Sequence, residues 1–218
     1  MSTPTDAKTA LSVQSGLSKG ARTRERILDL AYDAIVAKGF AATSIDELIE
    51  GAAISRSGFF YHFRDKNDLA RQLIQRSLIE TEQALDDMES RARELHEDPL
   101  HAFLIFLKFY EEMMSDLLEK HPGCLVAAVV YQDRTFDPEV RATAKEMMVK
   151  WRARFLRWLT EIAAVHPLRM KVELVDLADH PNVVADGAII SAKCFEDYDL
   201  MRRQANLMRE MIRMAFGA

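Results

Sequence analysis

Cysteine, glycine, proline and long apolar runs are all scarce in this chain of 218 residues. Two cysteines are too few for a disulfide scaffold or a four-cysteine zinc site. The longest uninterrupted apolar run, 124–131, is far shorter than the roughly 20 residues that cross a bilayer. The polar N-terminus lacks the apolar core of a signal peptide. We therefore expect a cytoplasmic protein without a membrane segment, and we exclude secreted mini-domains and collagen-like chains.

Helix-forming residues are what the chain has in quantity. Hydrophobic residues make up 49% and charged residues 29%, as in soluble globular proteins and unlike disordered ones. Alanine, leucine, methionine, glutamate and arginine are abundant, and these residues lose little rotamer freedom in a helix. No stretch alternates convincingly between polar and apolar residues as a strand does. The sequence therefore predicts an all-α fold.

The net charge of −5 conceals a basic stretch near the N-terminus. Between residues 19 and 26, Lys19, Arg22, Arg24 and Arg26 face only one acidic residue, Glu25. An acidic protein with a locally basic end suits a polyanionic partner that docks at that end. A solvated helix start explains the same charges, so the charge pattern by itself leaves both interpretations open.

Helical periodicity and capping residues divide the chain into about nine helices. Residues 1–18 show no periodicity and are interpreted as a disordered arm. Serine, threonine or aspartate precedes most of the predicted helices, as expected at an N-cap. The helices are expected at about 22–38, 43–51, from 55, 65–95, from 98, 124–131, 137–165, 181–194 and 199–216. We assign residues 19–65 to one domain and 66–218 to a second.

The segment 43–66 carries the clearest functional pattern. Its two short helices, joined by a tight turn, are the skeleton of a helix-turn-helix. Leu48, Phe59 and Phe63 can form a small core, while Arg56 and Ser57 begin the second helix. One such helix fits the major groove of DNA, which is about 12 Å wide. Short helical pairs are common, so the pattern alone does not establish DNA binding.

Residues 22–69 resemble the TetR family of bacterial transcriptional regulators. The match rests on Thr43, Leu48, the run Ala-Ala-Ile-Ser at 52–55, the run Phe-Tyr-His-Phe at 60–63, and Lys66 followed by Leu69. The resemblance implies a three-helix DNA-binding head and a helical body that binds a small molecule and forms a homodimer. It also implies a double-stranded, near-palindromic DNA operator as a partner.

The resemblance implies contacts to DNA residue by residue. Thr43, Ser44 and Lys66 would bind phosphate, and the front of the second short helix would lie nearest the bases. The implied DNA-binding residues are Arg22, Arg24, Thr43, Ser44, Ser55, Arg56, Ser57, Phe60, Tyr61, His62 and Lys66.

Three positions depart from the family pattern. Ala53 replaces the usual turn glycine, and a positive φ there would cost about 1 kcal/mol. Ile49 replaces a small alanine and could separate the two short helices. Phe60 lacks the hydroxyl with which the usual tyrosine would hold a phosphate. These departures bear on DNA contact more than on the fold.

Bulky apolar residues of the C-terminal part are compatible with the lining of a ligand pocket. Ordinary core packing explains the same residues. The candidates are Phe103, Phe106, Tyr110, Met113, Met114, Trp151, Phe155 and Trp158. Tyr110, Gln132 and Arg134 could serve as polar anchors. We expect the small-molecule effector to have apolar character.

The last two predicted helices carry apolar and small residues that suit a dimer interface. In a homodimer, two such helices from each chain would form a four-helix bundle, as in the family. The candidates are Val184, Ala188, Ala192, Met201, Met208, Met211, Ile212 and Ala215.

Catalytic and metal-binding motifs are missing from the sequence. It has no nucleophile elbow, dinucleotide-binding, Walker or H-E-x-x-H pattern. No two of its six histidines are three or four residues apart. We therefore predict a ligand-responsive repressor with no catalytic residue, metal or cofactor. The alternatives are a helical scaffold that has lost DNA binding and a small helical enzyme.

Overall fold

Nine helices and no strand make up residues 18–120, 125–130 and 136–217, the part of the chain described by a computed structural model. The predicted all-α class is confirmed. In chain order the helices are α2 (Lys19–Lys38), α3 (Ile45–Gly51), α4 (Arg56–His62), α5 (Lys66–Leu95), α6 (Pro99–Lys120), α7 (Leu125–Val130), α8 (Pro138–Val165), α9 (Leu174–Phe195) and α10 (Leu200–Phe216). No helix of this described part is long and apolar enough to span a bilayer.

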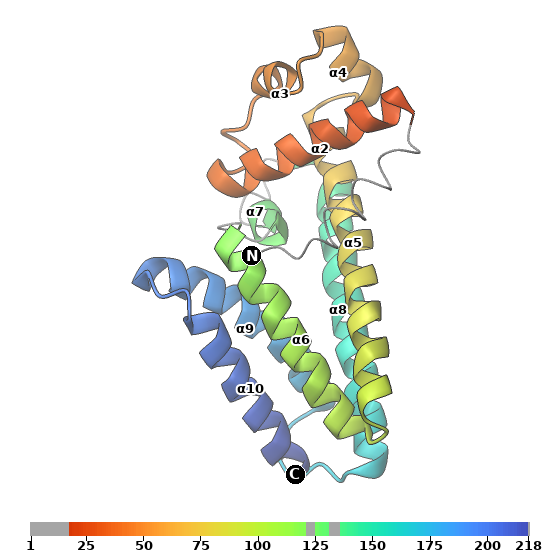
Figure 1. The fold of residues 1–218 in the computed structure, drawn as a ribbon, viewed down its shortest axis with the longest axis vertical. Helices are drawn as coiled ribbons and strands as arrows, with labels where there is room; N and C mark the ends of the chain where they lie inside the picture. Colours follow the sequence, from red (N-terminus) through yellow and green to blue (C-terminus); the bar gives the residue numbers. More distant parts are fainter. Residues whose placement is uncertain (1–17, 121–124, 131–135, 218) are drawn as a thin grey trace.

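The helices form a small head and a longer body (Figure 1). The head consists of α2, α3 and α4, and the body consists of α5 to α10. Helices α5 and α8 pack together and run from the head to the far end of the body, while α6, α9 and α10 cover one side of the body (Figure 1).

The predicted helix starts are set by side-chain caps. Ser44, Ser55, Asp65 and Asp137 each accept a hydrogen bond from the backbone N–H three residues ahead. Such a bond satisfies one of the four N–H groups that the first turn leaves unpaired. Local sequence therefore fixed the starts of α3, α4, α5 and α8.

Two helices begin earlier than the sequence indicated. Helix α2 begins at Lys19 rather than near Arg22, because Ser18 caps it by accepting from Ala21 N at 3.2 Å. Helix α9 begins at Leu174 and carries Pro181 inside it, where we expected the helix to start. Leu177, Ala178 and Pro181 are buried, and this packing outweighs the backbone hydrogen bond that proline removes. Residues 1–17, expected to be a disordered arm, lie outside the described residues.

Two hydrophobic cores stabilise the chain. One joins the head to the first half of α5, to α7 and to the start of α8. The other fills the body between α6, α9, α10 and the second halves of α5 and α8. Trp151 packs against both cores. The head thus shares its core with parts of the body, so packing continues across the expected boundary at residue 65.

Charged contacts hold α5 in place at two levels. Near the head, Arg76 binds Asp29 of α2 at 2.7 Å, and Arg24 of α2 binds Gln72 at 2.7 Å. Further along, the buried Arg154 of α8 contacts three carboxylates of α5, at 2.6–3.0 Å: Glu82, Asp86 and Glu89. Helix α5 therefore connects the head rigidly to the body.

Candidate DNA interface and ligand pocket

Helices α3 and α4 form the helix-turn-helix that the sequence predicted. Leu48, Phe59 and Phe63 are buried in the core of the head. The opposite face of α4 is exposed: 82% of Tyr61 and 44% of Phe60 is accessible to solvent. Large aromatic residues are thus available on the outer surface of a short helix, where they can contact DNA sugars or thymine methyl groups.

Arg56 lies at the exposed front of α4. Its guanidinium binds the Asp46 carboxylate at 2.7 Å and lies 5.8 Å from the centre of the Phe60 ring. An ion pair exposed on both sides contributes little stability, so Arg56 can leave Asp46 for a base at small cost. Ser55 caps α4, and its hydroxyl lies 2.9 Å from that of Ser57.

Several predicted DNA-binding residues stabilise the head itself. Thr43 is buried and donates its hydroxyl hydrogen to Gly39 O at 3.0 Å, while Ser44 caps α3. Lys66 Nζ donates to Phe40 O and lies 4.2 Å from the Phe40 ring. Burial lowers the pKa of Lys66, although Glu47 opposes the shift. Arg24 binds Gln72. These four side chains hold neighbouring segments together in the free protein.

The remaining predicted residues lie around the same surface. Arg22 is exposed on the first turn of α2. His62 is partly buried at the end of α4, and burial, with the charge of Arg24, lowers its pKa, so it is neutral at pH 7. The structure therefore brings Arg56, Ser57, Phe60 and Tyr61 together on one exposed face.

Ala53, in the turn between α3 and α4, has a φ of 49°. This is the positive φ that the family's usual glycine would adopt easily and that alanine adopts at a cost of about 1 kcal/mol. The turn is maintained because Ala53 N donates to Glu50 O and Ile54 N donates to Ile49 O. The larger Ile49 is accommodated, since it packs partly buried against the core of the head.

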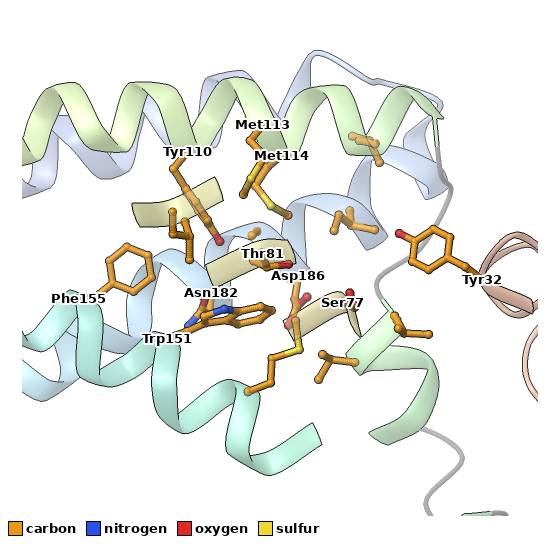
Figure 2. Close-up of a pocket in the computed structure, with 17 residues that line it drawn as sticks. Tyr32, Ser77, Thr81, Tyr110, Met113, Met114, Trp151, Phe155, Asn182 and Asp186 are labelled. Atoms are coloured by element: carbon orange, nitrogen blue, oxygen red, sulfur yellow. The ribbon is translucent and has the colours of Figure 1, made fainter. Parts of the chain in front are cut away.

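A cavity lies in the body directly beneath the head (Figure 2). It holds about 850 Å³ of empty space, part of it open to solvent, and most of its lining residues are apolar or aromatic, as is usual in ligand sites. Five of the predicted pocket residues line it: Tyr110, Met113, Met114, Trp151 and Phe155.

The other three predicted pocket residues do not line the cavity. Phe103, Phe106 and Trp158 are buried in the body core, where the two phenyl rings lie 5.5 and 5.9 Å from the Trp158 ring. They occupy neighbouring turns of α6 and α8 and pack against each other. Gln132 and Arg134, the other suggested polar anchors, lie outside the described residues.

Of the polar lining, sequence reasoning predicted only Tyr110. Ser77 and Thr81 come from α5, Asn182 and Asp186 from α9, and Tyr32 from α2 of the head (Figure 2). The four-residue spacing of Asn182 and Asp186 within an apolar helix was a usable signal, since polar groups on a buried face usually have a purpose. Trp151 Nε1 is buried and has no hydrogen-bond partner among the residues that the structure describes. A ligand acceptor would satisfy it.

Comparisons with known proteins agree with this geometry. Residues 27–73 match the family model of bacterial regulatory proteins, tetR family. Transcriptional regulator AcuR of Cereibacter sphaeroides is 22% identical over 182 residues, which cover 82% of this chain and 80% of AcuR. HTH-type transcriptional regulator AcrR of Shigella flexneri is 35% identical over 51 residues, which cover 23% of this chain but only 24% of AcrR.

Solved structures show the same fold over most of the chain. A TetR-family transcriptional regulator from Agrobacterium tumefaciens superimposes with a TM-score of 0.77 at 19% identity, covering 88% of this chain and 98% of that one. A regulatory protein TetR from Rhodobacter sphaeroides gives a TM-score of 0.71 at 22% identity, with 88% and 98% coverage. Fold and exposed α4 together define a helix-turn-helix transcriptional regulator. Residues 27–73 match the DNA-binding region of the tetR family of bacterial regulatory proteins, and the whole chain has the fold of solved TetR-family regulators.

Replacing Ala53 with glycine should stabilise the protein. Relief of the positive φ gains about 1 kcal/mol, and the greater freedom of glycine in the unfolded chain returns part of it, leaving a gain of up to about 0.5 kcal/mol. Urea denaturation of Ala53→Gly measures the difference. The control is Ala153→Gly in the exposed middle of α8, which should lose about 1 kcal/mol. Equal losses in both variants would show that the turn carries no strain.

Proposed function

We propose that the protein is a homodimeric repressor that binds a near-palindromic DNA operator in the cytoplasm and is released when a small molecule fills the cavity. The observation that carries this proposal is that Tyr32, on the first helix of the DNA-binding head, lines the same cavity as Tyr110 and Trp151 of the body. A ligand in the cavity touches the head directly. We assign no catalytic role to the chain.

The exposed face of α4 supports reading of DNA in the major groove. Arg56 has the fork of N–H groups that binds guanine O6 and N7, and Tyr61 can pack against a thymine methyl group. Ser57 and the exposed Arg22 are available for phosphate. Lys66 and Thr43 would act mainly by holding the head in shape, because their polar atoms already bind backbone carbonyls.

The surface of α9 and α10 supports a dimer, on a different face from the expected one. Six predicted interface residues are buried in the protomer's own core: Ala188, Ala192, Met201, Met208, Ile212 and Ala215. Val184 and Met211 are partly buried against that core. The reason is that the apolar stripe of α10 packs against α6 and α9 of the same chain.

A second apolar stripe on these helices is exposed. Val183 is 64% and Ile190 48% exposed on α9, and Leu207 is 61% and Met214 63% exposed on α10. Within each helix the two residues are seven apart and so share a face. Between the α9 pair, Gly187 has open space at its Cβ position, which allows a partner helix to approach closely. We assign the dimer interface to this stripe.

A charged substitution in the exposed stripe tests the dimer interface. Leu207→Glu should convert the dimer to a monomer, because a two-fold interface buries the new carboxylate twice beside apolar side chains. Analytical ultracentrifugation measures the mass, and circular dichroism checks folding. Val149→Glu on α8, an exposed valine outside the stripe, is the control and should stay dimeric. A Leu207→Glu protein that remains dimeric contradicts the assignment.

DNA reading is tested by fluorescence anisotropy against the DNA upstream of the protein's own gene, with random DNA as control, at two salt concentrations. Specific binding should be at least about 10³-fold tighter than random binding and should weaken with salt. Arg56→Ala should weaken specific binding by about 1–3 kcal/mol and leave random binding nearly unchanged. Arg152→Ala removes an exposed arginine of α8 that is paired with Asp179, and it should change neither specific nor random binding.

Two results would contradict the DNA proposal. Equal losses on specific and random DNA would remove Arg56 from base reading. Binding no tighter than to random DNA, also after selection from random sequences, would favour a helical scaffold that has lost DNA binding.

The cavity is tested with the neutral fluorescent probe N-phenyl-1-naphthylamine. One probe should bind per chain and quench Trp151, one of only two tryptophans. Thr81→Phe should weaken probe binding at least tenfold, because the phenyl ring occupies part of the cavity that Thr81 lines. Thr160→Phe, an exposed threonine on α8, is the control. Unchanged binding in Thr81→Phe would show that the probe binds elsewhere.

A further inference from the structure

The turn between α5 and α6 brings together three side chains of the kinds that bind metal ions, two histidines and one aspartate. His96, Asp98 and His101 each place one donor atom within 4.8 Å of those of the other two. The turn lies at the end of the body opposite the head, beside the end of α8 (Figure 1). The group is therefore separate from both the DNA interface and the cavity.

Backbone contacts fix the position of Asp98. Its Oδ1 accepts hydrogen bonds from the backbone N–H groups of Leu100 and His101, each at 3.0 Å, and so caps α6. The same oxygen lies 2.9 Å from His101 Nδ1. The carboxylate is thus held at a constant place, and an adjacent imidazole already lies against it.

The two histidines of the turn lie side by side. The rings of His96 and His101 stack with centroids 4.6 Å apart, and His96 Nδ1 accepts a hydrogen bond from Asp98 N at 3.1 Å. Both rings are exposed on the outer side, which leaves an entry path for an ion from solvent.

His166 supports the group from a different helix. It follows the last residue of α8, and its Nε2 donates to Asp98 Oδ2 at 2.6 Å. Metal-binding carboxylates and imidazoles usually have such a partner, which orients them and adjusts their basicity. The bond also connects the α5–α6 turn to the end of α8.

The carboxylate is ionised at neutral pH. Burial opposes ionisation, but hydrogen bonds from His101 and His166 outweigh it and lower the pKa of Asp98 well below its ordinary value. One anionic oxygen and two imidazole nitrogens can therefore serve as ligands once the metal replaces two hydrogen bonds, the one from Asp98 N to His96 Nδ1 and the one between His101 Nδ1 and Asp98 Oδ1.

We propose that His96, Asp98 and His101 bind one divalent transition-metal ion of the Zn²⁺, Co²⁺ and Ni²⁺ class, with His166 positioning Asp98. Two imidazoles and one carboxylate favour these ions over Mg²⁺ and Ca²⁺, which prefer oxygen ligands alone. Three protein ligands leave a fourth position for water, as in other open zinc sites.

Small rotations bring the donors to coordination distance. Metal–ligand bonds of about 2.0–2.2 Å in a tetrahedron require donors about 3.4 Å apart. The two exposed imidazoles reach this spacing by rotation about χ2, for which the energy profile is broad. When the metal binds His101 Nδ1, the hydrogen that faces Asp98 exchanges through solvent to Nε2, so the imidazole stays neutral and no net proton is released.

The spacing explains why we expected no metal site from the sequence. His96 and His101 are five residues apart, which does not place two side chains on one helical face. The break between α5, which ends at Leu95, and α6, which begins at Pro99, bends the chain so that the two rings meet.

Titration with Co²⁺ tests the proposal on tag-free protein that has been treated with a chelator and dialysed. The visible ligand-field bands of Co²⁺ report coordination, displacement by Zn²⁺ reports competition, and thermal unfolding reports stabilisation. We expect one ion per chain at micromolar concentration and a higher Tm with metal, since a ligand that binds only the folded state stabilises it.

Four variants make the test specific. His96→Gln and His101→Gln should abolish the bands and the Tm increase. His166→Gln should weaken binding about 10–100-fold, as expected for loss of an outer partner. His180→Gln removes a partly buried histidine of α9 outside the cluster and should bind Co²⁺ like the unmodified protein. The Tm of each variant without metal shows that it is folded.

Three results would overturn the proposal. The first is no saturable Co²⁺ or Zn²⁺ binding below millimolar concentration. The second is binding that persists in both His96→Gln and His101→Gln. The third is binding that His180→Gln weakens as much as they do. If one turn variant fails to fold, the shift of the His96 and His101 imidazole NMR signals with Zn²⁺ in the unmodified protein decides the question in its place.

Discussion

Helix α5 belongs to both hydrophobic cores, and the relation between the head and the body depends on it. Its first half packs Leu69, Leu73 and Ile74 into the core of the head, and Leu85 and Ala92 pack into the core of the body. Ion pairs with α2 and α8 oppose sliding of α5 along its neighbours. Because a helix is stiff along its axis, a shift of α5 at the level of the cavity becomes a shift of the head.

The cavity lies where such a shift can begin. Ser77 and Thr81 place α5 in its wall, and Tyr32 adds α2. A ligand changes DNA binding only through a difference in its affinity for two arrangements of these helices, and a difference of about 1–3 kcal/mol is typical. A cavity wall built from the head itself allows that difference to arise by direct contact.

The polar residues of the head fall into two groups, those that bind other parts of the protein and those that are exposed on α4. Thr43 and Lys66 bind carbonyls of the α2–α3 connection, and Arg24 binds α5, so these residues maintain the shape of the head. Arg56 and Tyr61 keep exposed side chains on α4. The positive φ of Ala53 lies in the turn between the two short helices, which the head keeps at a cost in stability. The matched segment thus contains residues that maintain the shape of the head as well as residues that remain exposed on α4.

The sequence by itself determined the all-α class, most helix starts and the helix-turn-helix, because N-caps such as Ser55 and Asp65 and the apolar spacing of each helix act within a few residues of the chain. It could not determine which helices face one another. The stripe of α10 that suited a dimer is the protomer's own core, Tyr32 and Asn182 reach one cavity from distant helices, and His96 meets His101 across a helix break. Only tertiary structure decided these contacts, since packing depends on the combined shape of several helices, which the periodicity of a single helix does not contain.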